Sequence, residues 1–122
     1  MEQEITRGDI FYADLSGAIG SEQNGKRPVI IIQNDIGNKY SPTTIVLPLT
    51  KTLHRKTRLP THIDLKTLDC IKYNSTILIE QIRTIDKTRI DEKIGHIEDE
   101  NIMMMINKRI EIALGIKDLT SL

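Results

Sequence analysis

Aromatic residues, cysteine and net charge are all scarce in this 122-residue chain. One Phe, three Tyr and no Trp leave too few rings for a platform that grips a single-stranded nucleic acid mainly by stacking its bases. The single cysteine, Cys70, excludes an internal disulfide framework and a multi-cysteine metal site. The 17 basic and 17 acidic side chains cancel. This balance argues against an overall basic coat but leaves room for a local basic patch.

Long hydrophobic runs are missing as well. Residues 29–32 and 102–106 are the longest, and both fall short of the roughly 18 residues that a membrane-spanning helix needs. The first seven residues are rich in charge and do not resemble a signal peptide. With one cysteine, these features predict a cytoplasmic protein without membrane contact. The length predicts one domain, residues 1–122.

Isoleucine is abundant, with 22 copies, and its β-branched side chain favours a sheet over a helical bundle. Short apolar segments alternate with polar turns, which is typical of a mainly β domain. The expected strands are residues 9–14, 28–33, 44–50, 61–65, 75–85, 88–90 and 93–97. The glycine-containing segment 16–26 is expected to be a mobile loop, and residues 34–42 and 68–74 are expected to be connections.

The hydrophobic period changes near the C-terminus. Ile102, Ile106, Ile110 and Ala113 recur at helical spacing. Acidic residues 98–100 precede them, where a helix dipole favours negative charge, and Gly115 is a plausible C-terminal stop. We therefore predict a mainly β fold, a small and partly closed barrel or coiled sheet, that carries one C-terminal helix.

Cations gather in one short segment. Lys51, Arg55, Lys56 and Arg58 lie within eight residues, with His54 among them, and no carboxylate occurs between positions 51 and 63. Such a cluster can contact a phosphate backbone, although it can also be a solvated loop. The three histidines have no metal-ligand spacing, and the sequence holds no phosphate-binding loop or GxSxG nucleophile motif. We therefore expect neither a metal nor a cofactor.

Arg27 and Thr50 stand out by position. Arg27 joins the glycine-containing loop to a buried strand, and Thr50 ends the next strand. If these two strands pair in antiparallel fashion, a planar multidentate cation and a hydroxyl lie close enough to hold a phosphate. The alternative is an ordinary arginine at the sheet rim and a threonine that merely ends a strand.

Several strings of residues, in this order and spacing, resemble the MazF/PemK family of toxin endoribonucleases, and most closely its members from Gram-positive bacteria. The segment 20–29 reads GSEQNGKRPV where the family has GSEQxGxRPV. The other matching segments are residues 7–15, 33–35, 41–44, 59–62 and 80–86. The resemblance covers nearly the whole chain.

The resemblance implies an SH3-like barrel with a C-terminal helix, and a homodimer. It also implies a type II toxin that cleaves single-stranded RNA at short motifs without a metal. The expected products carry a 2′,3′-cyclic phosphate and a 5′-hydroxyl. A cognate MazE-like antitoxin is expected to occupy the RNA groove, which crosses the dimer.

The family's catalytic arginine and threonine fall on Arg27 and Thr50. A guanidinium is a poor base but a good clamp for negative charge on phosphorus, so charge stabilisation is the role that chemistry favours for Arg27. Glu22 matches a family residue needed for activity, as a loop-positioning or base-contacting group, although it can be a plain solvated loop residue. The expected substrate-binding residues are Ser21, Glu22, Gln23, Lys56, Pro60, Thr61, His62 and Gln81.

Two other functions stay open at this point. A CcdB-like toxin on the same fold poisons gyrase through its C-terminal residues and has no nuclease centre. A barrel that binds nucleic acid without cutting it is the other alternative, because a fold does not fix a function.

Overall fold

The computed structural model describes residues 3–52, 59–65, 68, 70–71 and 73–121. Its elements, in chain order, are β1 (Asp9–Asp14), β2 (Lys26–Ile31), α1 (Asp35–Tyr40), β3 (Thr43–Lys51), β4 (His62–Leu65), β5 (Ser75–Leu78), η1 (Ile79–Gln81), β6 (Arg83–Asp86), η2 (Lys87–Arg89), β7 (Ile90–His96), α2 (Glu100–Ala113) and η3 (Leu119–Ser121). The prediction of a mainly β fold with a C-terminal helix is confirmed.

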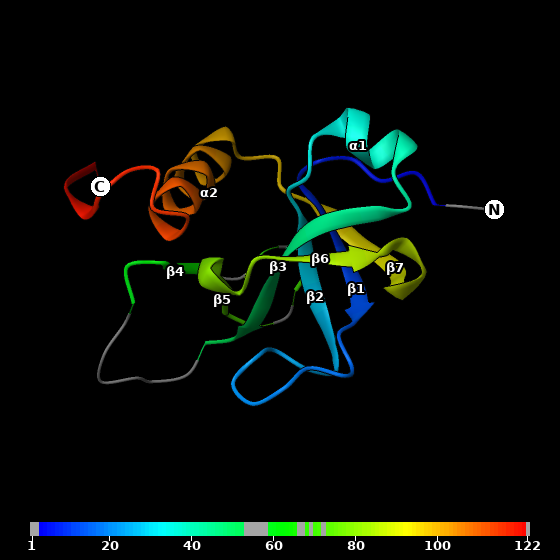
Figure 1. Ribbon diagram of the computed structural model, residues 1–122. Helices are drawn as coiled ribbons and strands as arrows, with labels where there is room; N and C mark the ends of the chain where they lie inside the picture. The colour runs from blue at the N-terminus through cyan, green and yellow to red at the C-terminus, as the bar shows by residue number, and fades with distance from the viewer. Residues whose placement is uncertain (1–2, 53–58, 66–67, 69, 72, 122) are drawn as a thin grey trace.

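The strands form one coiled antiparallel sheet (Figure 1). Within the described residues it has seven strands in the order β4-β5-β3-β2-β1-β7, and β6 pairs with β3 beyond the end of β5. β3 is thus the central element, because it pairs with β2 on one edge and with β5 and β6 on the other. This long strand carries Thr50 near its end and connects the two halves of the sheet.

Alternation along the strands separates two hydrophobic clusters. One cluster includes Phe11, Val29 and Val46 and lies on one face of the β1–β2–β3 region. The other includes Ile30, Leu47 and Ile77 and lies on the opposite face, under α2. The uninterrupted apolar run at residues 29–32 suits this arrangement, because Val29 and Ile31 enter one cluster and Ile30 enters the other.

The helix α2 closes the second cluster. Ile106 is fully buried there, and Ile102, Met103, Ile110 and Ala113 pack around it. The Asp99 carboxylate caps the N-terminus by accepting a hydrogen bond from Asn101 N–H at 2.8 Å. The helix ends before Gly115, whose φ of +74° is the left-handed conformation common after a helix C-terminus.

Three expectations about secondary structure are wrong. Residues 34–42 contain the helix α1, which the Asn34 side chain caps by accepting from Gly37 N–H at 2.8 Å. Instead of the strand expected at residues 88–90, residues 87–89 form the 3₁₀ turn η2, and the strand β7 begins only at Ile90.

The third correction concerns residues 75–85, expected to be one strand. The turn η1 divides them into β5 and β6. Leu49 pairs with Ile77 whereas Val46 pairs with Arg83, so three positions along β3 correspond to six along the opposite chain. The additional residues leave the sheet as η1, because both flanking segments keep their pairing with β3. Glu80 and Gln81 are therefore displaced from the sheet.

Candidate functional site

Arg27 and Thr50 lie side by side. The pairing of Val29 with Pro48 and of Ile30 with Leu47, continued along both strands, places Arg27 opposite Thr50. Directly opposite residues of antiparallel strands project to the same face, and Arg27 Nη1 lies 3.5 Å from Thr50 Oγ1. The two strands therefore pair in antiparallel fashion, as the prediction from the sequence required.

The guanidinium of Arg27 is held but not neutralised. Its Nε donates to the carbonyl oxygen of Asn24 at 2.8 Å, which fixes the plane of the group at the end of the loop. In the part of the chain that the structure describes, no carboxylate forms an ion pair with it. The remaining N–H donors and the Thr50 hydroxyl can together hold a tetrahedral anion.

The loop between β1 and β2 is anchored at its root. Leu15 N–H donates to Gly25 O at 2.9 Å, and Arg89 Nη1 donates to the carbonyl oxygens of Asp14 and Ser16, each at 3.0 Å. Lys26 Nζ lies 2.9 Å from the Asp91 carboxylate, which raises the pKa of Lys26. Hydrogen bonds from Ser16 lower the pKa of Asp14. The end of β1 is thus bonded to η2, and the start of β2 is bonded to β7.

Glu22 lies within the loop and does not contact the Arg27–Thr50 pair through any hydrogen bond or ion pair in the described residues. Its carboxylate accepts a hydrogen bond from Ile19 N–H at 2.6 Å, and its own N–H donates to Ile19 O at 3.2 Å. Gly20, inside this turn, has a φ of +59°, which glycine adopts without strain. In this conformation Glu22 shapes the loop.

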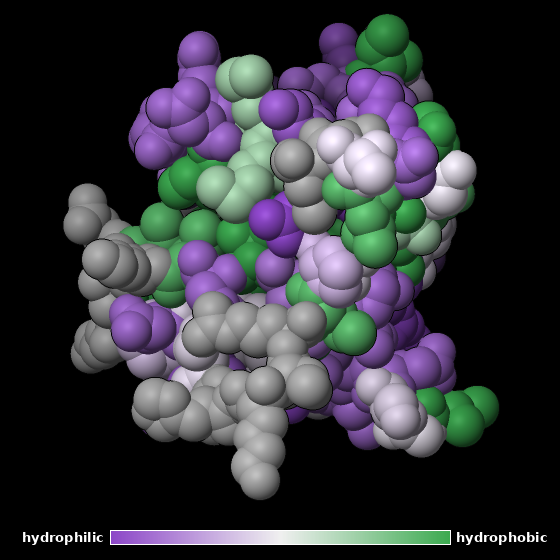
Figure 2. All heavy atoms as spheres, turned by 90° about the vertical axis from the view of Figure 1, so that its left-hand side faces the viewer, coloured by the Kyte–Doolittle hydropathy of each residue, from purple (hydrophilic) through white to green (hydrophobic). Residues whose placement is uncertain are grey.

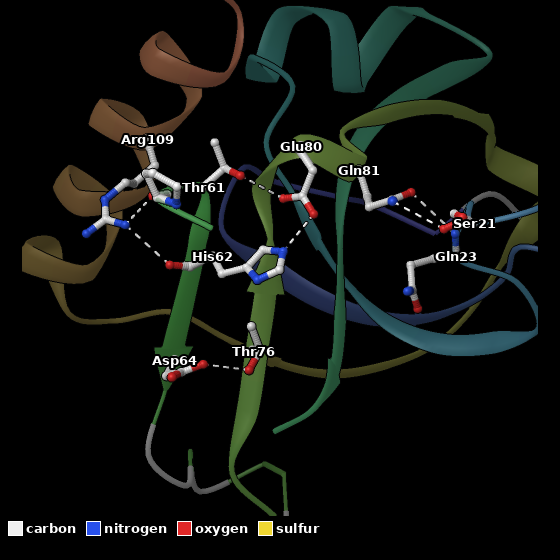
Figure 3. A network of polar contacts seen from close by, with 10 residues as sticks. Ser21, Gln23, Thr61, His62, Asp64, Thr76, Glu80, Gln81 and Arg109 are labelled. Atoms are coloured by element: carbon white, nitrogen blue, oxygen red, sulfur yellow. Dashed lines mark hydrogen bonds and ion pairs between the residues drawn. The ribbon is translucent and has the colours of Figure 1, made fainter. Parts of the chain in front are cut away.

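Gln81 braces the loop from η1 (Figure 3). Its Oε1 accepts from Gln23 N–H at 3.3 Å, and its Nε2 donates to Ser21 O at 3.4 Å. The loop expected to be mobile is therefore hydrogen-bonded near its tip as well as at its root. The Gln23 side-chain oxygen is buried and, among the described residues, has no hydrogen-bond partner.

The start of β4 contributes a second group of predicted residues. Glu80 accepts from Thr61 Oγ1 at 3.0 Å through one carboxylate oxygen, and the other lies 2.7 Å from His62 Nε2. The His62 side chain is only 8% exposed, so this contact fixes the imidazole. Pro60 is exposed and immediately precedes the pair. Figure 3 shows Glu80 and Gln81 as neighbours that reach in different directions, one to β4 and one to the loop.

Sequence reasoning missed Glu80, although it stands beside Gln81 in a segment that carried the resemblance. It also missed a polar row on the face that carries Thr50. Thr76 pairs with Thr50 across β3 and β5, and with Asp64 across β5 and β4. Thr76 Oγ1 lies 3.0 Å from Thr52 Oγ1 and donates to Asp64 at 2.6 Å. No local motif in the sequence distinguishes these residues, since only the register brings them together.

Lys56 lies outside the described residues, as does most of the basic segment. In the described part of the chain, no cluster of three or more His, Cys, Asp or Glu side chains is arranged to hold a metal ion. Nor does that part contain a helix long and apolar enough to cross a bilayer.

The comparisons with known proteins decide the family. A family model described as PemK-like, MazF-like toxin of type II toxin-antitoxin system matches residues 6–114. The chain belongs to this family. Endoribonuclease EndoA of Bacillus subtilis is 48% identical over 118 residues, which cover 93% of this chain and 97% of that protein. Endoribonuclease MazF of Staphylococcus saprophyticus is also 48% identical, over 96% of this chain and 97% of its own length.

Solved structures of PemK-like and MazF-like proteins share the fold. MazF from Deinococcus radiodurans superposes with a TM-score of 0.77 at 18% identity, covering 93% of this chain and 98% of that one. A mycobacterial endoribonuclease in complex with its cognate antitoxin superposes with a TM-score of 0.74 at 24% identity, covering 93% and 97%. The prediction of this family and its fold is thereby confirmed.

Proposed function

We propose that this chain is a toxin of a type II toxin-antitoxin system that acts, as a single domain, as a metal-independent endoribonuclease on single-stranded RNA such as mRNA. The observation that carries the proposal is the juxtaposition of Arg27 and Thr50 at 3.5 Å at the base of the loop. The two relatives named as endoribonucleases, each 48% identical over nearly the whole chain, support it. On this proposal the protein acts in the cytoplasm and arrests growth by cleaving mRNA.

The reaction that we propose is an internal transesterification. The 2′-oxygen of one nucleotide forms a bond to the adjacent phosphorus, and the bond from phosphorus to the 5′-oxygen breaks. The 2′-hydroxyl loses a proton and the 5′-oxygen gains one, which leaves a 2′,3′-cyclic phosphate and a 5′-hydroxyl. No metal and no cofactor is needed to balance these atoms.

Arg27 serves this reaction by stabilising charge. The pentacoordinate intermediate carries more negative charge on its oxygens than the ground state, so a fixed guanidinium binds it more tightly. Its bond to Asn24 O holds the guanidinium in place before the RNA arrives. Thr50 donates its hydroxyl hydrogen to the same phosphate. Proton transfer through Arg27 is the weaker role, because a guanidinium keeps its proton at any ordinary pH.

The substrate lies along the loop and the start of β4. Gln23 carries a side-chain amide in this loop, a group that can hydrogen-bond the edge of a splayed base, the mode by which single-stranded RNA is read. Thr61 and His62 both contact Glu80 and lie at the start of β4. Pro60 supplies an apolar surface there, and Lys56 supplies a phosphate contact. Ser21, Glu22 and Gln81 hold the loop in shape and contact the RNA beside it.

The partners that we propose are a second copy of the chain and a MazE-like antitoxin. Figure 2 looks onto the side where α2 and β4 lie, and hydrophobic side chains reach its surface among hydrophilic ones. Met104, Met105 and Ile116, on and just beyond α2, are between 41% and 67% exposed, which suits burial between two copies. The mycobacterial endoribonuclease of similar fold, which is in complex with its cognate antitoxin, supports the proposal of an antitoxin partner.

One assay tests the activity. Purified protein is incubated in EDTA with a long single-stranded RNA, and the new ends are analysed chemically. We expect cuts at a short motif with cyclic phosphate and 5′-hydroxyl ends. Intact RNA contradicts the nuclease and leaves a gyrase poison or a non-cutting binder, which a gyrase assay and a retention assay distinguish. Cuts that require added metal contradict the mechanism.

The two central residues are tested by paired variants. Arg27→Ala and Thr50→Ala are each expected to remove most of the cleavage while RNA retention and the circular dichroism spectrum persist. Both side chains lie at the rim of the sheet, so the free energy of unfolding changes by less than about 1 kcal/mol. Thr50→Ser keeps the hydroxyl and is expected to keep most of the activity, whereas Arg27→Lys keeps the charge but loses the planar fork. Wild-type cleavage by either alanine variant contradicts that residue's assignment.

A further inference from the structure

β4 is an edge strand of the sheet. It pairs with β5, and Thr61 O accepts from Ile79 N–H at 3.0 Å on that side. Carbonyl groups along a strand alternate in direction, so the carbonyl of His62, the first residue of β4, faces the opposite, outer edge. Such an outer row has no strand to pair with and needs another donor.

Arg109 of α2 supplies that donor. Its Nη1 donates to His62 O at 3.3 Å and to Pro60 O as well. Figure 3 shows the guanidinium reaching from the helix to the first residues of β4. Arg109 is half-buried, and its Nε is buried without a hydrogen-bond partner among the described residues. Among the described residues, these two carbonyl contacts are the hydrogen bonds that hold the guanidinium in place.

The clamped segment connects directly to the candidate site. This segment runs from Pro60 to His62, whose carbonyls accept from Arg109. Within it, Thr61 and His62 both contact Glu80. Gln81, next to Glu80, contacts Ser21 and Gln23 of the loop. Residues 60–62 are thus fixed from the helix on one side and from η1 on the other.

We propose that Arg109 is a positioning residue for RNA binding, which holds Pro60, Thr61 and His62 in the conformation that receives the substrate. This inference rests on the proposed endoribonuclease function. Arg109 itself does not touch the RNA. It acts by reducing the number of conformations of the binding segment before the RNA arrives, so its loss weakens binding and leaves the chemistry at Arg27 and Thr50 intact.

The test compares Arg109→Met, which keeps the apolar stem but removes every donor, with wild-type protein. The substrate is an oligoribonucleotide that spans a site cut by the wild type. We expect KM to rise about tenfold with kcat within about twofold of the wild-type value. Arg109→Lys can still donate to one carbonyl and is expected to recover part of the KM.

Two further measurements separate positioning from charge and from folding. Lys117→Met, just beyond α2, removes the same charge and is expected to leave KM unchanged. Amide hydrogen exchange in a peptide covering residues 59–65 is expected to speed up in Arg109→Met but not in Lys117→Met. An unchanged KM in Arg109→Met, or an equal rise in both methionine variants, overturns the proposal. If the wild type does not cut RNA, the proposed function fails, and the exchange data alone then report whether Arg109 holds the segment.

Discussion

At the scale of single residues, the Glu22 carboxylate is turned toward its own loop, where it accepts from Ile19 N–H at 2.6 Å. A glutamine can accept the same hydrogen bond without the charge. If the role of Glu22 is to shape the loop, Glu22→Gln is expected to keep at least about a third of the wild-type kcat/KM, whereas Glu22→Ala loses about tenfold. Steady-state cleavage of one oligoribonucleotide by both variants measures this. A glutamine variant as inactive as the alanine variant points instead to a role for the negative charge.

Asp9 is the most buried carboxylate among the described residues, at 1% exposure. Its Oδ1 lies 2.7 Å from His96 Nδ1 and 3.3 Å from Lys93 Nζ, and its Oδ2 accepts from Thr6 N–H at 2.8 Å. Burial by itself raises the pKa of Asp9, but these partners outweigh it, and the pKa is lowered overall. A lowered pKa stabilises the fold fully above the unfolded value of about 4 and progressively less as the pH falls through the folded value.

Asp9→Asn is therefore expected to reduce the free energy of unfolding by about 2 kcal/mol at pH 7, and the difference from wild type is expected to narrow below about pH 4. Urea unfolding at pH 7 and pH 3 measures both values. Glu92→Gln, exposed on the strand β7, is the control and is expected to change little at either pH. A difference that stays constant with pH excludes ionised Asp9 as the source of the stability.

At the scale of elements, α2 is held by one deeply buried side chain. Ile106 is fully buried against the sheet, and truncation of such a residue costs the lost burial plus a cavity. Ile106→Ala is expected to lower the free energy of unfolding by about 3 kcal/mol. Ile36→Ala is the matched control, because Ile36 on α1 is 75% exposed and the same atoms are deleted. Equal losses in the two variants, measured by urea unfolding, contradict the packing of α2 described above.

The elements that the sequence predicted best are those whose pattern repeats. The six residues of β1 were predictable as a short apolar segment between polar turns, and α2 was predictable from its helical spacing. The turn η1 was not, because Ile77, Ile79, Ile82 and Ile85 suit a continuous strand. The break arises from the register of β5 and β6 against β3, which is a tertiary property. The helix α1 is different, since Asn34 and Asp35 form a recognisable N-terminal signal.

The same distinction applies to the site. The proximity of Arg27 and Thr50 followed from two strands and one assumption about pairing. Glu80, Thr76 and Arg109 did not follow, because they come from three different elements that meet only in the folded sheet. Side chains that act across strands or from a helix onto a strand have no fixed spacing in the sequence.

At the scale of the whole molecule, the charges sum to zero, yet the proposed substrate is a polyanion. The attraction between protein and RNA must therefore come from a few cationic side chains that lie along the binding site. For single-stranded nucleic acids, each phosphate contact contributes about 0.7 to the slope of log affinity against log salt. A neutral protein with three or four such contacts is thus expected to show a slope of about −2 to −3, shallower than that of a basic nucleic-acid-binding protein.

If the basic segment, residues 51–58, contacts phosphates, Lys56 accounts for part of the dependence of RNA affinity on salt. Lys56→Ala is expected to weaken retention of RNA to a similar extent for every sequence and to reduce the slope by about 0.7. Binding to Arg27→Ala protein, which retains RNA without cutting it, allows the measurement by fluorescence anisotropy between low and moderate salt. Lys39→Ala, an exposed cation on α1, is the matched control and is expected to leave the slope unchanged. A slope that Lys56→Ala does not alter places the phosphate contacts elsewhere, and a loss confined to one RNA sequence makes Lys56 a reader of bases rather than of the backbone.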